Sequence, residues 1–93
     1  MGYAVGWASE AEDDIDRIAR KHPVSASHIL DQIDTLAAAP ISLSRPSSFP
    51  HQDFQKYQFF VPTENGQLWV TVLFLYLPDE ATIEVQGIGV VEL

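Results

Sequence analysis

Three residues near the middle of the chain are of types that could carry acid–base or phosphate chemistry. Arg45 and Lys56 are cations, and His51 lies between them in a segment rich in Ser and Pro. A histidine can take a proton from a hydroxyl near neutral pH, and neighbouring cations can neutralise charge that develops on a phosphate. The alternative is that His51 is a surface residue of a loop and that Lys56 protects a strand edge against aggregation.

The distribution of charge limits this chemistry. The 93-residue chain has a formal net charge of −8, and all of its Lys and Arg residues lie at or before Lys56. Residues 57–93 contain Asp and Glu but no basic residue. Because attraction to a phosphate backbone depends on positive charge, we expect no direct binding to DNA and little unaided affinity for RNA.

Metal and cofactor sites are not predicted. The chain has no cysteine, so disulfides and thiolate ligands are excluded. His22 and His28 fall near the expected helix ends, where a helix-dipole contact and an exposed first-turn position explain them without a metal. We expect one domain over residues 1–93, with no spanning segment and no signal peptide, and therefore a cytoplasmic protein.

The elements that would position these residues begin with a short alternating strand over residues 3–7. Helical periodicity follows over residues 9–22 and again over residues 25–39. Ser9 and Glu12 have the spacing of a capping box for the first helix, and Ser25 is a candidate cap for the second. Because few residues separate the two helices, we expect an antiparallel helix hairpin with one apolar stripe on each helix. A Ser/Pro-rich loop over residues 40–52 follows.

The second half of the chain predicts strands. Alternating residues from 53 onward lead into Asn65-Gly66, which is a strong two-residue hairpin turn, and an apolar run follows over residues 68–77. A last strand covers residues 83–92. The turns predict that Val61 lies opposite Val70 and that Phe74 lies opposite Val85.

This register gives the sheet two different faces. One is continuously apolar and should carry the helices: Tyr57, Phe59, Val61, Val70, Val72, Phe74, Tyr76, Ile83 and Val85. The opposite face mixes a polar frame with large apolar groups that the helix hairpin cannot cover. A partner chain or a second copy of the protein could cover it, since exposed apolar patches mark interaction sites; alternatively, loop 40–52 or a terminus folds over it. The candidate partner-binding residues are Phe60, Trp69, Leu73, Leu75 and Ile88.

Three stretches resemble the RelE/ParE toxin superfamily, the plasmid-stabilisation type of type II toxin–antitoxin system. Residues 5–18, VGWASEAEDDIDRI, are similar to its opening strand and first helix. Residues 36–40, LAAAP, are similar to the end of its second helix, and Ile88-Gly89-Val90 resembles its final strand. The resemblance implies an α+β fold of order β-α-α-β-β-β, in which a two-helix hairpin packs on one face of an antiparallel sheet. It also implies a cognate antitoxin, and action as a ribosome-dependent mRNA endonuclease or as a DNA gyrase inhibitor.

The chain departs from the nuclease members of that superfamily at two cationic positions. Those members carry an Arg on a strand that corresponds to residues 69–73 and end with Gly-His-Arg, where this chain has Gly89-Val90-Val91. We therefore predict a toxin-like component that acts through protein binding and has little or no ribosome-dependent mRNA cleavage of the kind usual in that superfamily. Two alternatives remain: an active RelE-type endonuclease that uses Arg45, His51 and Lys56, and a non-toxic homodimeric interaction module.

Overall fold

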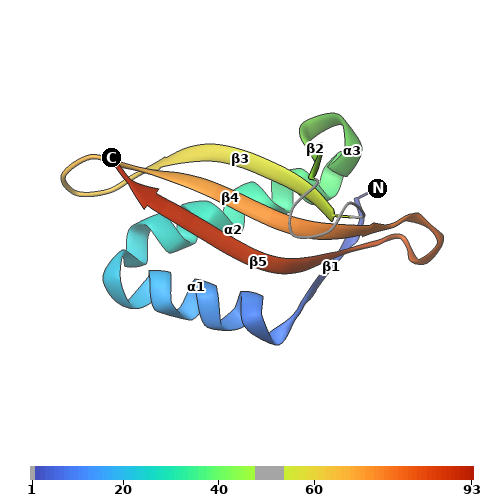
Figure 1. Ribbon diagram of the computed structural model, residues 1–93, viewed down its shortest axis with the longest axis horizontal. Helices are drawn as coiled ribbons and strands as arrows, with labels where there is room; N and C mark the ends of the chain where they lie inside the picture. The colour runs from blue at the N-terminus through green and yellow to red at the C-terminus, as the bar shows by residue number, and fades with distance from the viewer. Residues whose placement is uncertain (1, 48–53) are drawn as a thin grey trace.

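The structure, a computed structural model, describes residues 2–47 and 54–93. A five-stranded sheet has the strand order β1-β5-β4-β3-β2. Two helices, α1 and α2, lie along the same face of the sheet, and within the described residues the opposite face has no helix of comparable length (Figure 1). The α+β class and the helix hairpin on one face are as predicted.

The connection between the two helices is shorter than the sequence predicted. Helix α1 covers Ser9–Lys21 and helix α2 covers Pro23–Ala38, so only His22 separates them. The N-cap of α1 is Ala8, not Ser9, and no side-chain hydrogen bond caps the helix, so the predicted capping box is absent. Ser25 is not a cap either. Pro23 begins α2, as suits a residue with a helical φ and no N–H, and the buried Ser25 Oγ donates to the Pro62 carbonyl at 2.7 Å.

The sheet is mixed, which corrects the prediction of an antiparallel sheet. Strand β1, Ala4–Trp7, pairs in parallel with β5, Thr82–Glu92. The other neighbouring pairs are antiparallel. The direction of β1 depends on the path that the chain takes through α1 and α2 before it returns to the sheet. A four-residue alternating segment does not reveal that path.

Two short elements occupy the predicted loop. Helix α3 covers Pro40–Leu43, and strand β2, Arg45–Ser47, pairs with the start of β3, Phe54–Pro62. Ser and Pro disfavour regular structure locally, and β2 forms because β3 offers an adjacent edge. His51 lies outside the described residues.

The β3–β4 hairpin has a different register from the predicted one. Strand β4 covers Gln67–Leu77, and Val61 lies opposite Leu68, not Val70. The turn spans four residues, and the Thr63 N–H donates to the Gly66 carbonyl at 2.9 Å. Because the shift is by two residues, every side chain stays on its predicted face.

The β4–β5 hairpin begins in the predicted register and then changes. A 3₁₀ turn, η1 (Pro78–Glu80), precedes Ala81, which adopts a left-handed conformation with φ of 48°, and Phe74 lies opposite Val85 as predicted. Between Leu73 and Phe74 the register shifts by one residue on β5, which is a β-bulge. Beyond this bulge, the residues of β5 change face relative to the prediction.

The bulge overturns the predicted position of Ile88. This residue lies opposite Val72, is 5% exposed and packs in the core beneath the helices. The Ile88 N–H donates to Asp14 Oδ2 on α1 at 2.9 Å. Helix α1 therefore supplies a hydrogen-bond acceptor at the β-bulge of β5.

The core lies between the helices and one face of the sheet. Tyr57, on this side, donates its hydroxyl to Gln32 Oε1 of α2 at 2.6 Å, and burial raises the pKa of the Tyr57 phenol. The largest fully buried apolar side chains are Phe74, Ile29, Ile33, Leu36, Leu68, Ile83, Val70, Val72 and Val85.

Candidate functional site

The open face of the sheet is the side of β2–β5 that faces away from α1 and α2. The strand register arranges its residues in rows across the strands. One row is Phe60, Trp69 and Val91, and the next contains Gln58 and Thr71. The following rows contain Arg45, Lys56 and Leu73, and then Phe54, Leu75 and Glu84.

One end of the open face is aromatic. The rings of Phe60 and Trp69 lie 4.6 Å apart between centroids, with their planes tilted by 51°. Phe60 is 54% exposed, and Val91, opposite Trp69, is 56% exposed. The neighbouring glycine of β5, Gly89, has open space where a Cβ would lie. This end therefore presents apolar surface that the helices do not cover.

Two cations lie side by side near the middle of the same face. Arg45 and Lys56 are directly opposite each other on β2 and β3. They line a hollow of about 370 Å³ with Leu43, Gln58 and Trp69. The Gln58 amide donates to Thr71 Oγ1 at 3.0 Å. Neither cation forms an ion pair with a described residue, so the hollow is positively charged.

An acidic group lies on the other side of the open face. Glu84 on β5 is opposite Leu75, and the amide of Gln86 donates to Glu84 Oε1 at 2.7 Å. Among the described residues, Glu84 has no cationic partner. The open face thus carries positive charge near β2 and β3 and negative charge on β5.

Some of the residues predicted from the sequence do meet on this face. Arg45 and Lys56 converge, but His51, the third of the catalytic candidates, lies outside the described residues. Of the partner-binding candidates, Phe60 is exposed and Trp69, Leu73 and Leu75 are half-buried on the open face. Ile88 is in the core.

Two contributors to the open face were missed. Val91 takes a position there because of the bulge, and the nearby glycines Gly87 and Gly89 were a signal, since glycine within a strand often marks a bulge. Leu43 reaches the hollow from α3. No periodicity in the Ser/Pro segment indicates that placement.

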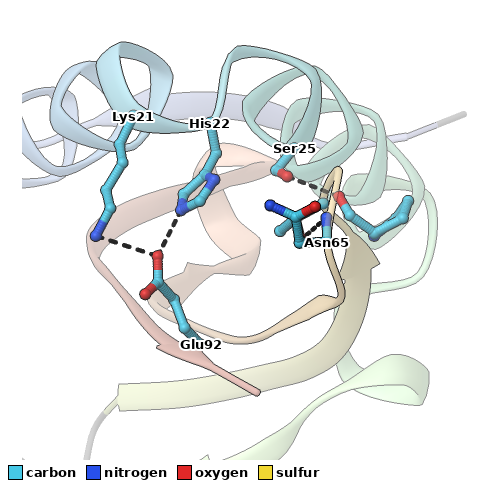
Figure 2. A network of polar contacts seen from close by, with 7 residues as sticks. Lys21, His22, Ser25, Asn65 and Glu92 are labelled. Carbon is cyan, nitrogen blue, oxygen red and sulfur yellow. Dashed lines mark hydrogen bonds and ion pairs between the residues drawn. The ribbon is translucent and has the colours of Figure 1, made fainter.

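A second pocket of about 620 Å³ lies where the α1–α2 turn meets the β3–β4 hairpin. Figure 2 shows Lys21 and His22 pointing toward Glu92 at the end of β5. Glu92 Oε1 lies 2.7 Å from His22 Nε2 and 3.2 Å from Lys21 Nζ. These two contacts, first that with His22, lower the pKa of the Glu92 carboxyl below its ordinary value. Lys21 at this corner is therefore already paired with Glu92.

The residues for which the structure gives positions contain no group of three His, Asp or Glu side chains suited to a metal. In the same part of the chain, no helix combines the length and apolar composition that crossing a bilayer requires.

The arrangement of strands and helices matches a known structure. A chain of the toxin–antitoxin complex RelBE2 from Mycobacterium tuberculosis superposes with a TM-score of 0.78, covering 96% of this chain and 91% of that chain, at 11% sequence identity. This chain has a RelE-like fold. No family model and no curated protein sequence matches it. The RelE-like fold is therefore visible in the backbone, whereas at this identity the side chains of the site must be interpreted by themselves.

Proposed function

We propose that this chain is the toxin-like component of a type II toxin–antitoxin pair and that it acts by binding a protein through the open face of its sheet. The observation that carries the proposal is a RelE-like fold whose central strands, β4 and β5, contain no Lys or Arg. The similar structure is a toxin–antitoxin complex, which supports an antitoxin as the partner. A cytoplasmic location fits this role.

The chemistry of the open face favours binding over catalysis. Cleavage of RNA by its own 2′-hydroxyl needs a base and cations placed around the phosphate. In the described residues of the open face, the cations are Arg45 and Lys56, both at one side. Phe60 and Trp69 provide the large aromatic surface that is typical of binding anchors. The ribosome and DNA gyrase are the candidate host targets.

The decisive experiment is inducible expression in a bacterial host, with growth and mRNA integrity measured together. We expect growth arrest without mRNA cleavage, relieved by co-expression of a small antitoxin-like protein from a neighbouring reading frame. The double variant Trp69→Ala/Leu73→Ser should lose co-purification with that protein while remaining folded. No arrest and no association of the wild type with such a partner would exclude the proposal.

An RNA-cleaving toxin is the second candidate, and the convergence of Arg45 and Lys56 in one hollow favours it. It predicts mRNA cleavage at physiological salt that is lost in Arg45→Gln/Lys56→Gln. Cleavage that survives these substitutions and His51→Ala would place the chemistry elsewhere. The homodimeric module is less favoured, because each copy carries a net charge of −8 and two copies repel each other.

A further inference from the structure

The open face has a charge polarity that the function described so far does not use. Arg45 and Lys56 occupy one side, Glu84 occupies the other, and Leu73 lies on the strand between them. Within the described residues, none of these three charges has an oppositely charged partner. By contrast, Lys21 on the helix side is paired with Glu92.

This arrangement does not stabilise the monomer. Like charges directly opposite each other on neighbouring strands destabilise a sheet, and Arg45 and Lys56 are such a pair. Glu84 is two strands away from Lys56, so the sheet keeps the opposite charges apart. A group that enters between the cations would remove their repulsion.

The hollow around the two cations suits a carboxylate. A guanidinium can hold a carboxylate with two parallel hydrogen bonds, and an ammonium adds a further charged donor. Trp69, which also lines the hollow, can contribute an indole N–H and apolar surface beside the charge. An acidic side chain next to an apolar one would use both parts of the hollow.

We propose, building on the protein-binding function above, that the open face receives one helix of a basic partner protein, laid across the strands. An acidic side chain of that helix lies between Arg45 and Lys56, apolar side chains cover Trp69 and Leu73, and a basic side chain lies at Glu84. A helix fits better than an extended segment, because a helix satisfies its own backbone hydrogen bonds when it packs on the face of a sheet.

The register sets the spacing of the charges in the partner. Lys56 on β3 and Glu84 on β5 are two strands apart and lie in neighbouring rows, which gives a separation of about 12 Å at the usual strand and residue spacings. Along a helix this distance corresponds to about seven to eight residues, a separation that keeps two side chains on the same side. The acidic and basic residues of the partner should therefore be about two helical turns apart.

Charge also distinguishes this partner from the other occupants. A chain with a net charge of −8 attracts a partner that is basic overall and repels a second copy of itself. Single-stranded RNA would find two cations on this face, which support only weak, salt-sensitive binding.

The test uses the full-length protein and a displayed library of amphipathic helical peptides with randomised exposed positions. Selection on the wild type should enrich peptides with an acidic and a basic residue about seven to eight positions apart, flanking apolar residues. The affinity of an enriched peptide should fall at least about tenfold for the variant Arg45→Glu/Lys56→Glu/Glu84→Lys. A peptide in which the acidic and basic residues are exchanged should restore binding to that variant.

The control is Arg20→Glu, which changes the net charge by the same amount on an exposed position of α1 and should leave peptide affinity unchanged. Circular dichroism confirms folding; if the triple variant is unfolded, Arg45→Gln/Lys56→Gln and Glu84→Gln replace it, each with an expected loss of several-fold. The inference is wrong if no peptide is enriched, if enriched peptides lack the charge pattern, or if exchange of their charges does not restore binding.

Two further outcomes separate this inference from the function on which it rests. Tight binding of random-sequence single-stranded RNA that is lost in Arg45→Gln/Lys56→Gln would assign the hollow to RNA and overturn the inference. If the antitoxin relieves growth arrest but binds the charge-reversed variant as well as the wild type, the inference fails and the toxin-like function stands. If the peptide pattern is found but expression never arrests growth, the toxin-like function fails alone.

Discussion

The two sides of the sheet use charge in opposite ways. On the helix side, Lys21 and His22 meet Glu92, and Arg17 lies 2.6 Å from Asp14. On the open side, Arg45 and Lys56 lie beside each other and, in the part of the chain that the structure describes, no acidic side chain pairs with either. The contacts with Glu92 join the α1–α2 turn to β5, and the Arg17–Asp14 pair lies within α1. The unpaired cations are available to another molecule.

The sharpest contrast between the sides is in packing. Phe74 is 0% exposed on the helix side, so Phe74→Ala should lower the free energy of unfolding by about 3–5 kcal/mol through the cavity that it leaves. Glu84→Ala on the open side should cost less than about 1 kcal/mol. Denaturant unfolding of both variants measures the difference. Equal losses would contradict the assignment of the faces.

The next largest effect on stability is expected at the β-bulge of β5, which places Ile88 in the core and not on the open face. Asp14→Ala removes the acceptor of the Ile88 N–H and the partner of Arg17, so it should lower the free energy of unfolding by about 1–3 kcal/mol. Asp13→Ala, at an exposed position next to it, is the matched control and should be close to neutral. Hydrogen exchange should show faster exchange of the Ile88 amide in Asp14→Ala. Unchanged exchange would mean that Asp14 does not hold the bulge.

Replacing cations by neutral residues should change the free energy of unfolding in opposite directions on the two sides of the sheet. Arg45→Gln/Lys56→Gln removes a like-charge pair and should leave stability unchanged or raise the free energy of unfolding by about 0.2–1 kcal/mol. Arg17→Gln removes an ion pair and should lower it by about 0–1 kcal/mol. Thermal unfolding at low salt detects both changes. Destabilisation by the first variant would show that those cations support the monomer.

The smallest expected effect is on the dependence of stability on pH. The pKa of Glu92 in the folded protein is lowered, first by His22 and then by Lys21. Between that lowered pKa and the ordinary value, the unfolded chain binds more protons, so stability should fall as the pH falls through this window. Glu92→Gln should reduce that slope in urea titrations at acidic pH. Identical slopes would remove the role assigned to Glu92.

The α+β class and the division of the strands into two faces could be predicted from the sequence. The signals are local: side chains alternate with period two in β3 and β4, and apolar residues recur with helical periodicity in α1 and α2. These signals assign a residue to a face correctly even where the predicted strand register is wrong. The β3–β4 register was wrong by two residues, yet Phe74 and Trp69 stayed on their predicted sides because side chains repeat every second residue. Trp69 and Leu73 were identified as open-face residues for this reason.

Only the tertiary structure decided which charges and apolar groups share a site. The bulge in β5 turned Ile88 into the core and Val91 outward, because one extra residue reverses the face of all that follow it. The three-residue β2 placed Arg45 opposite Lys56, although their separation in sequence includes the Ser/Pro segment. Lys21 and Glu92 likewise meet from distant parts of the chain. Sequence patterns determined the period of each element, whereas these pairings depend on how separate elements dock, which no local pattern encodes.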